Sequence, residues 1–388
     1  MLDQIFVYAK QWLVALAPGP WQPLISGLIS VAAIIGTFAS LFAVTTLLER
    51  KGLGRIQNRY GPNRVGPWGL LQPAADGLKA LIKEDLVPRT ADAVLHFAAP
   101  LVLVAPVFLS LAVLPMGRNM TAVDLDSGAL FFFAVGAATE LAVFMAGWSS
   151  HNKYSLLGAM RALAQMLSYE VPLLLSATTV FMMAGSLSTV QIVDAQAGYS
   201  GWLPHWFVLT PWGFAAFVLF MIAATAEANR SPFDLPEGES EIIAGYYVEY
   251  SGFKFALFFL GEYIGLFATN GLAITLFLGG WHAPLPFLEP IPSWAWFFGK
   301  LLALICLSIW VRGTLPRLRM DQLMNFAWKF MLPMALVDLV ATGAWRFLEP
   351  GAVRWLICGM LVVGPYLALS RTFLDHKQFA KRTYHFAE

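Results

Sequence analysis

Long runs of apolar residues alternate with short polar segments along nearly the whole chain. A helix needs roughly 20 apolar residues to cross a bilayer, and nine runs approach or exceed that length: 24–48, 94–117, 128–148, 161–186, 211–227, 254–280, 294–312, 326–348 and 351–371. Hydrophobic residues make up 58% of the chain and charged residues only 13%, which is outside the range of soluble globular domains. We therefore predict an all-α polytopic membrane protein, with residues 1–388 forming a single membrane domain.

The lysines and arginines are unevenly distributed among the connections between these runs. If the connections after odd-numbered spans share one side, that side collects 20 of the 25 basic residues. The positive-inside rule makes the richer side cytoplasmic, so we expect the N-terminus outside and the C-terminus in the cytoplasm. The N-terminus lacks the pattern of a cleaved signal peptide.

The first cytoplasmic connection, residues 49–92, contains a second kind of pattern. Leu71, Ala75, Leu78 and Ile82 fall on one helical face and polar residues on another, which predicts an amphipathic helix lying flat in the membrane interface. Five basic residues at 50–64 precede it. They either follow the positive-inside rule and contact lipid head groups, or they form a docking surface for a soluble partner beside a doorway for a lipid-like ligand.

The connection at 227–253 is strongly acidic. It holds six of the chain's 24 acidic residues, which are Glu227, Asp234, Glu237, Glu239, Glu241 and Glu249. The spacing from Asp234 to Glu237 is that of a capping box, which predicts a short helix with Glu237 and Glu241 on one face. Repulsion between two carboxylates one turn apart would raise the pKa of at least one. The segment is either a hydrated helix-capping loop or a proton-handling site.

Four acidic residues lie inside predicted spans, where each costs about 2.5–3.5 kcal/mol at a helix centre. They are Glu140, Glu170, Glu262 and Asp338. Counted from the cytoplasmic ends, the three glutamates lie ~12–14 Å deep, and Glu227 would connect them to the acidic loop. Any one of them is compatible with a neutral, hydrogen-bonded structural role. Three at one depth favour a proton path.

Residues for holding a redox cofactor or a metal are scarce. The two cysteines, Cys306 and Cys358, both lie in apolar runs, so neither a disulfide framework nor an iron–sulfur site is expected. The six histidines show no metal-ligand spacing, and no phosphate loop or dinucleotide fingerprint occurs. If the chain takes part in redox chemistry, its partners hold the cofactors.

Several segments together resemble one known family. ERKGLGRIQNRYGPNRVGP with GLLQPAADGLK, then ALAQMLSYEVP, then EANRSPFDLPEGESEIIAGYYVEYSG are similar to signature segments of the H subunit, the membrane heel, of the proton-pumping NADH:quinone oxidoreductase, respiratory complex I. The resemblance extends from the first span to at least WKFMLP at 328–333. It implies a component of an H⁺-translocating enzyme in the bacterial inner membrane, joining the redox arm to antiporter-like subunits.

The resemblance also implies roles for matching residues. The quinone chamber and its access side would comprise Glu49, Arg50, Asp76, Arg230, Asp234, Glu237, Glu239 and Glu249. The proton path would comprise Glu140, Glu170, Glu227, Glu241 and Glu262, whereas Asp338 has no family role. Ubiquinone or menaquinone would be the substrate, and FMN and iron–sulfur clusters would reside in peripheral-arm partners. We also expect the chain to contact lipids. We expect it to bind neither nucleic acid nor a metal.

Two other functions remain compatible with the residues. The corresponding membrane subunit of an energy-converting hydrogenase would bind no quinone, and the long basic first loop with the full acidic loop favours the quinone enzyme. An autonomous proton or cation transporter would predict internal repeats with interrupted helices, which the sequence does not display.

Overall fold

The computed structural model describes residues 2–235 and 244–374, and every structural statement below refers to these residues. They are helical almost throughout. The α-helices are α1 (Ile5–Ala15), α2 (Gln22–Ile56), α3 (Gln72–Ile82), α4 (Ala93–Leu111), α5 (Gly128–Gly136), α6 (Ala138–Ser149), α7 (Lys153–Ala184), α8 (Thr189–Asp194), α9 (Pro211–Glu227), α10 (Gly252–Phe277), α11 (Ser293–Thr314), α12 (Met320–Phe326), α13 (Leu332–Phe347) and α14 (Ala352–Leu374). Strands β1 (Tyr199–Ser200) and β2 (Leu203–Pro204) form an antiparallel hairpin that pairs Tyr199 with Pro204.

The predicted fold class is confirmed. Eight helical segments in the described part of the chain are long and apolar enough to cross a membrane, among them α5 with α6 and α12 with α13 taken as single segments. The remaining expected span, 211–227, is the 17-residue α9. A five-residue π-helical stretch, η7 (Ala327–Met331), joins α12 to α13 just before Pro333. The sequence did not predict α1, because its 11 residues are too short for a span.

Local chemistry sets where several helices begin and end. The Asp92 side chain accepts hydrogen bonds from the backbone N–H groups of Val94 and Leu95 at the start of α4, and Asn152 caps α7 in the same way. Caps of this kind are worth about 1 kcal/mol each. α7 ends at Gly185, whose φ of 70° lies in the left-handed region that glycine adopts without strain.

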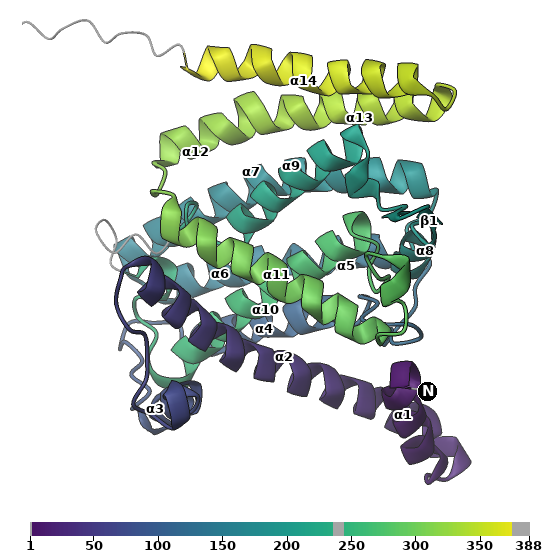
Figure 1. The fold of residues 1–388 in the computed structure, drawn as a ribbon. Coiled ribbons are helices and arrows are strands. Elements are labelled where there is room, and N and C mark those ends of the chain that lie inside the picture. The colour runs from purple at the N-terminus through teal and green to yellow at the C-terminus, as the bar shows by residue number, and fades with distance from the viewer. Residues whose placement is uncertain (1, 236–243, 375–388) are drawn as a thin grey trace, which may run out of the picture.

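The helices lie side by side, with their connections gathered at two ends (Figure 1). α2 runs along one edge of the bundle and α14 along the opposite edge, and α10 lies between (Figure 1). We call the end that carries the loop 228–251 the loop end and the opposite one, with α8 and the β-hairpin, the far end. α10 packs against α4, α9 and α11, and the residues from Leu266 to Phe277 are all buried.

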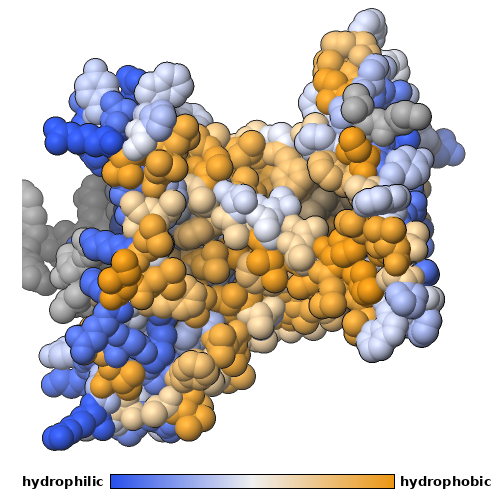
Figure 2. Space-filling model, turned by 90° about the horizontal axis from the view of Figure 1, so that it is seen from below, coloured by the Kyte–Doolittle hydropathy of each residue, from blue (hydrophilic) through white to orange (hydrophobic). Residues whose placement is uncertain are grey.

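The surface has the form expected of a membrane protein. Figure 2 shows a broad hydrophobic band between hydrophilic residues at the two ends. Helices α2 and α14 have few buried residues, so their apolar side chains face outward. The band places the loop end and the far end at the two sides of a bilayer.

The predicted amphipathic helix is present as α3, at the loop end (Figure 1). Its apolar residues Leu78 and Ile82 are 60% and 84% exposed, so its hydrophobic face is not covered by this chain. The segment after α3 is tied to the start of α10, because Lys254 pairs with Asp85 at 2.8 Å. Its position flat in the membrane interface stays a prediction.

Candidate proton and quinone site

A buried ion-pair network at the loop end is centred on Glu49, near the end of α2. Its carboxylate accepts a hydrogen bond from Arg312 of α11 and one of 2.5 Å from the Tyr263 hydroxyl, and it lies 3.5 Å from the guanidinium of Arg230. Glu49 is only 7% exposed. Two guanidiniums therefore share one carboxylate, which leaves the network with an excess of positive charge.

Arg230 is held in this network by contacts on several sides. Its guanidinium lies over the Tyr263 ring, 3.9 Å from the centroid. Burial alone would lower the pKa of Arg230, but Tyr263, Glu49 and Glu262 outweigh burial and hold that pKa above its ordinary value. Arg230 therefore remains charged throughout any accessible pH range.

The turn that brings Arg230 to this position is anchored by Gln165 of α7, which is fully buried. The Gln165 amide nitrogen donates to the carbonyls of Ala226 and Phe233, each at 2.7 Å, so it clamps both sides of the turn. Between them Asn229 has a φ of 49°, in the left-handed region that asparagine tolerates better than most residues. The start of the acidic loop is thus fixed to the bundle.

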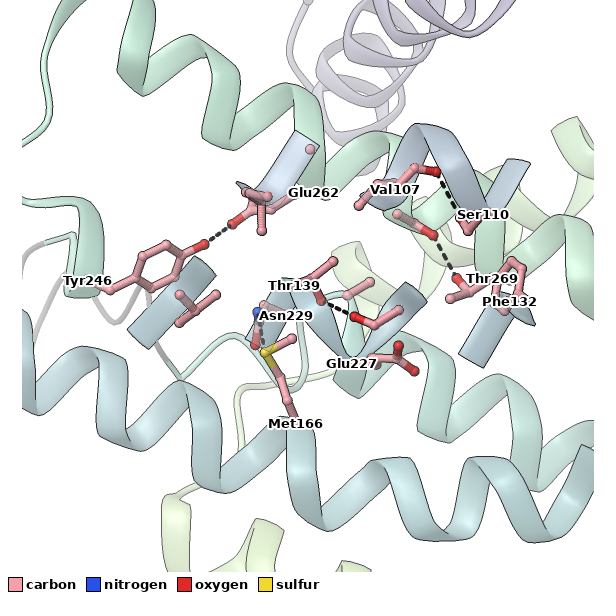
Figure 3. Close-up of a pocket in the computed structure, with 17 residues that line it drawn as sticks. Val107, Ser110, Phe132, Thr139, Met166, Glu227, Asn229, Tyr246, Glu262 and Thr269 are labelled. Atoms are coloured by element: carbon pink, nitrogen blue, oxygen red, sulfur yellow. Dashed lines mark hydrogen bonds between the residues drawn. The ribbon is translucent and has the colours of Figure 1, made fainter. Parts of the chain in front are cut away.

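A cavity of about 70 Å³ lies behind the network, among α4, α6, α7, α9 and α10 (Figure 3). One water needs at least about 10–15 Å³, so the cavity has room for a few. Glu227 and Glu262 both line it, and the Tyr246 hydroxyl donates a 3.0 Å hydrogen bond to Glu262 (Figure 3). One oxygen of Glu227, Oε2, is buried and has no hydrogen-bond partner among the described residues.

Three hydroxyls complete the polar wall of the cavity. Ser110, Thr139 and Thr269 each donate to a backbone carbonyl of their own helix turn. Their oxygen lone pairs remain as acceptors for water. The cavity is therefore suited to hold a short chain of hydrogen-bonded water molecules between carboxyl groups.

Glu140 of α6 and Glu170 of α7 form a pair beside this cavity. Their side chains lie close enough to interact with each other, and both lie close enough to Glu227 for their charges to interact with it. Each of the three comes from a different helix, and Glu262 lines the same cavity as Glu227 from a fourth. The structure thus brings together four of the five residues expected on the proton path. Glu241, the fifth, lies outside the described residues.

The acidic loop is tied to the bundle at both of its described ends. Asp234 pairs with Arg317 at 3.0 Å, between α11 and α12. Glu249 accepts a 2.6 Å hydrogen bond from Asn152, the residue that caps α7. Glu237 and Glu239 lie outside the described residues, as does the short helix expected to carry them.

Arg50 and Asp76 lie apart from the buried network. They form an ion pair at 2.5 Å that joins the end of α2 to α3, and their side chains are 51% and 39% exposed. Glu49 and Arg50 are adjacent in sequence, yet one belongs to the interior and the other to the surface.

Sequence reasoning missed several partners of the predicted residues. Arg312 was counted only as a cytoplasmic charge, and Gln165, Tyr246 and Tyr263 were not singled out. The available signal was weak: each is a polar residue beside or within an apolar run, next to a glutamate or in the helix that carries one. Among the described residues no group of three or more His, Cys, Asp or Glu is placed to hold a metal ion.

Asp338 of α13 remains apart from this site. It is fully buried, and neither carboxyl oxygen has a hydrogen-bond partner among the described residues. Since an unpaired charge is very costly away from water, the carboxyl must be neutral in this arrangement. Asp338 does not line the glutamate cavity.

Comparison with known proteins places the chain in a family. The profile of the NADH dehydrogenase family matches residues 29–343. The H subunit of NADH-quinone oxidoreductase from Dehalococcoides mccartyi (strain CBDB1) is 49% identical over 329 residues, which cover 84% of this chain and 89% of the relative. The H subunits from Geobacillus kaustophilus and Brevibacillus brevis are 48% and 44% identical, covering 86% and 90% of this chain and 97% and 99% of the relatives. The chain therefore belongs to the family of NADH-quinone oxidoreductase H subunits, the membrane subunits of respiratory complex I.

Proposed function

We propose that this chain lines the quinone chamber of a proton-translocating NADH:quinone oxidoreductase and passes protons from that chamber into the membrane through Glu227, Glu170, Glu140 and Glu262. As a complex I membrane subunit it is part of an H⁺-translocating oxidoreductase. The quinone is its substrate, and FMN and iron–sulfur clusters belong to partner subunits. Peripheral-arm subunits would bind at the loop end, and antiporter-like subunits would bind within the apolar band.

One observation carries this proposal: Glu262 links the positively charged network to the glutamate-lined cavity. Glu262 interacts with Arg230 of the network and also lines the cavity, so a change of charge at the network is felt at a carboxyl on the cavity wall. Two charges 6 Å apart interact by about 2.8 kcal/mol at an effective dielectric constant of about 20. That shifts a proton affinity by about two orders of magnitude, enough to change the protonation of a poised carboxyl.

The quinone side of the proposal rests on the network and on the surface that borders it. Quinone reduction produces negative charge that protons then neutralise, and the excess positive charge around Glu49, Arg230 and Arg312 favours such an intermediate. The apolar face of α3 and the Arg50–Asp76 pair lie outside this network. They are suited to the access side, where a long hydrophobic tail would enter from the membrane.

Purification of the tagged chain from native membranes in mild detergent tests the assembly. Co-elution with NADH:quinone activity, sensitive to quinone-site inhibitors, is the expected result. Co-elution with hydrogenase activity would instead support the energy-converting hydrogenase, and a chain that elutes alone and transports protons would support an autonomous transporter. Either of these two outcomes contradicts the proposal.

A further inference from the structure

Lys300 lies inside α11 at the far end of the bundle, and all of its N–H groups are engaged. Nζ donates to the backbone carbonyls of Leu278 at 2.6 Å, Gly280 at 2.9 Å and His282 at 2.8 Å. Nζ also lies 4.1 Å from the centroid of the Trp206 ring. An ammonium has three N–H donors and a neutral amine only two. Three carbonyl acceptors therefore specify the charged form of Lys300.

The carbonyl cage is built from the end of α10 and the tight turn that follows. The φ of Gly279 is 66°, and a Cβ on that residue would come within 2.3 Å of the Trp206 indole nitrogen, so only glycine fits. Gln196 of the 195–198 turn secures the same segment, because its amide nitrogen donates to Thr275 O at 2.9 Å and its carbonyl accepts from Gly279 N at 3.1 Å. Lys300 is thus fixed in place at the negative end of the α10 dipole.

Buried polar groups of α10 occupy the interval between the glutamate cavity and this cage. Thr269 lines the cavity. Asn270 is 1% exposed, and its side-chain nitrogen has no hydrogen-bond partner among the described residues. Thr275 is fully buried further along the helix, and the nine helical steps from Thr269 to Leu278 span only ~13 Å. An unpaired buried amide is a place where water can enter a helix bundle, so α10 offers polar groups between the cavity and the cage.

We propose that Lys300 is a fixed positive charge that closes the far end of α10 to protons from the glutamate cavity. A proton brought within ~6 Å of the ammonium is disfavoured about 100-fold at an effective dielectric constant of about 20. The three carbonyls favour the charged form of the side chain and hold it in one position, so the barrier cannot swing aside. Because a barrier matters only where protons reach the cavity, this role of Lys300 rests on the proposed function.

Arg346 provides a matched comparison. It is also a cation at the far end that donates to the last turn of a long helix, in this case to the carbonyl of Met182 in α7. Arg346 is exposed, and it does not line the glutamate cavity. If capping a helix were the whole role of Lys300, neutral substitutions at the two positions would behave alike.

The test is the passive proton permeability of proteoliposomes that contain the purified, assembled complex. A pH gradient is imposed without NADH, and its decay is followed with a trapped pH-sensitive dye. Lys300→Met should accelerate the decay at least about tenfold while NADH:quinone turnover persists, and Lys300→Arg and Arg346→Met should resemble the wild type. If Lys300→Met fails to assemble, Lys300→Gln, which is neutral but retains N–H donors, takes its place.

A second substitution separates this inference from the function on which it rests. The leak through Lys300→Met should fall back towards the wild-type rate when Glu227→Gln is added, because the leak would run through the cavity. If the pH gradient decays no faster with the Lys300→Met complex than with the wild type, the proposed barrier is ruled out. It is also ruled out if adding Glu227→Gln leaves the leak of Lys300→Met unchanged. The proton path itself fails on a different observation, namely normal pumping by the single Glu227→Gln variant.

Discussion

The side chains of Glu140 and Glu170 lie close enough to interact across the contact between α6 and α7. Two carboxyl groups this close can share a proton, because their titrations are coupled. The pair is therefore a proton-holding unit, and the nearby charge of Glu227 influences how tightly the proton is held. Neither helix could form this unit alone.

The first prediction concerns this pair. Glu140→Gln and Glu170→Gln should each lower pumping and quinone-linked turnover several-fold, because glutamine keeps the size and polarity of the side chain but removes an exchangeable proton. The double variant should be little worse than either single one, since residues that act as a unit are not additive. Turnover and proton translocation in membrane vesicles measure this, and effects that multiply fully would show that the two carboxyls act independently.

The second prediction concerns the network around Glu49. Arg230→Met should destabilise the assembled complex by about 3–5 kcal/mol, because it leaves a buried carboxylate with one of its two cationic partners removed. Arg317→Met is the matched control: it also breaks a pair with the acidic loop, but Arg317 is 37% exposed, so its loss should cost less than the loss of Arg230. Thermal inactivation of both variants measures the difference, and equal losses would contradict it.

The third prediction concerns the access side. Arg50→Ala should lower NADH:quinone turnover while oxidation of NADH by a water-soluble acceptor persists. Since the Arg50–Asp76 pair is largely exposed, its loss should cost less than about 1 kcal/mol of stability. Arg55→Ala is the control. Arg55 is a cation of the same helix, but it lies over the Tyr60 ring and not against α3. Full quinone activity in an assembled Arg50→Ala complex would count against this role.

The fourth prediction is a pH dependence at the far end. Burial first, and then Lys300 and Arg118, lower the pKa of His282 from 6.5 to about 4. Between these two pH values the unfolded chain binds a proton that the folded chain does not, so stability falls as the pH drops through this window. We expect a loss of about 1–2 kcal/mol, because the partly exposed ring is screened by water. Thermal inactivation of wild type and His282→Gln at pH 7.5 and pH 4.5 tests this, and an equal loss in both proteins would exclude His282 as the cause.

The sequence predicted the helical bundle well because a bilayer imposes a simple length and polarity on each span. The sequence also predicted that Glu140, Glu170 and Glu262 lie within spans, and they lie in α6, α7 and α10. Their common depth stays a prediction. Depth does not say which side chains touch, because the rotation of each helix is set by packing. Thus it did not show that Glu140 pairs with Glu170, whereas Glu262 bonds to Tyr246.

Long-range partners were beyond sequence reasoning for the same reason. Arg312 binds Glu49 from 263 positions away, and nothing in either segment specifies the other. The three carbonyls around Lys300 are backbone groups, which carry no sequence signal at all. The charge of Lys300 within an apolar run was visible, but its cage required the structure.

Proton translocation by the Glu227→Gln variant tests the central claim most directly. Glu227 interacts with the Glu140–Glu170 pair and lines the same cavity as Glu262, so it occupies the junction of the proposed path. Asp338→Asn is the matched control, because it replaces a carboxyl that is also inside the bundle but does not line the cavity. We predict that Glu227→Gln assembles normally but loses most proton pumping and quinone-linked turnover together, while Asp338→Asn retains both. Normal pumping by an assembled Glu227→Gln complex would contradict the account.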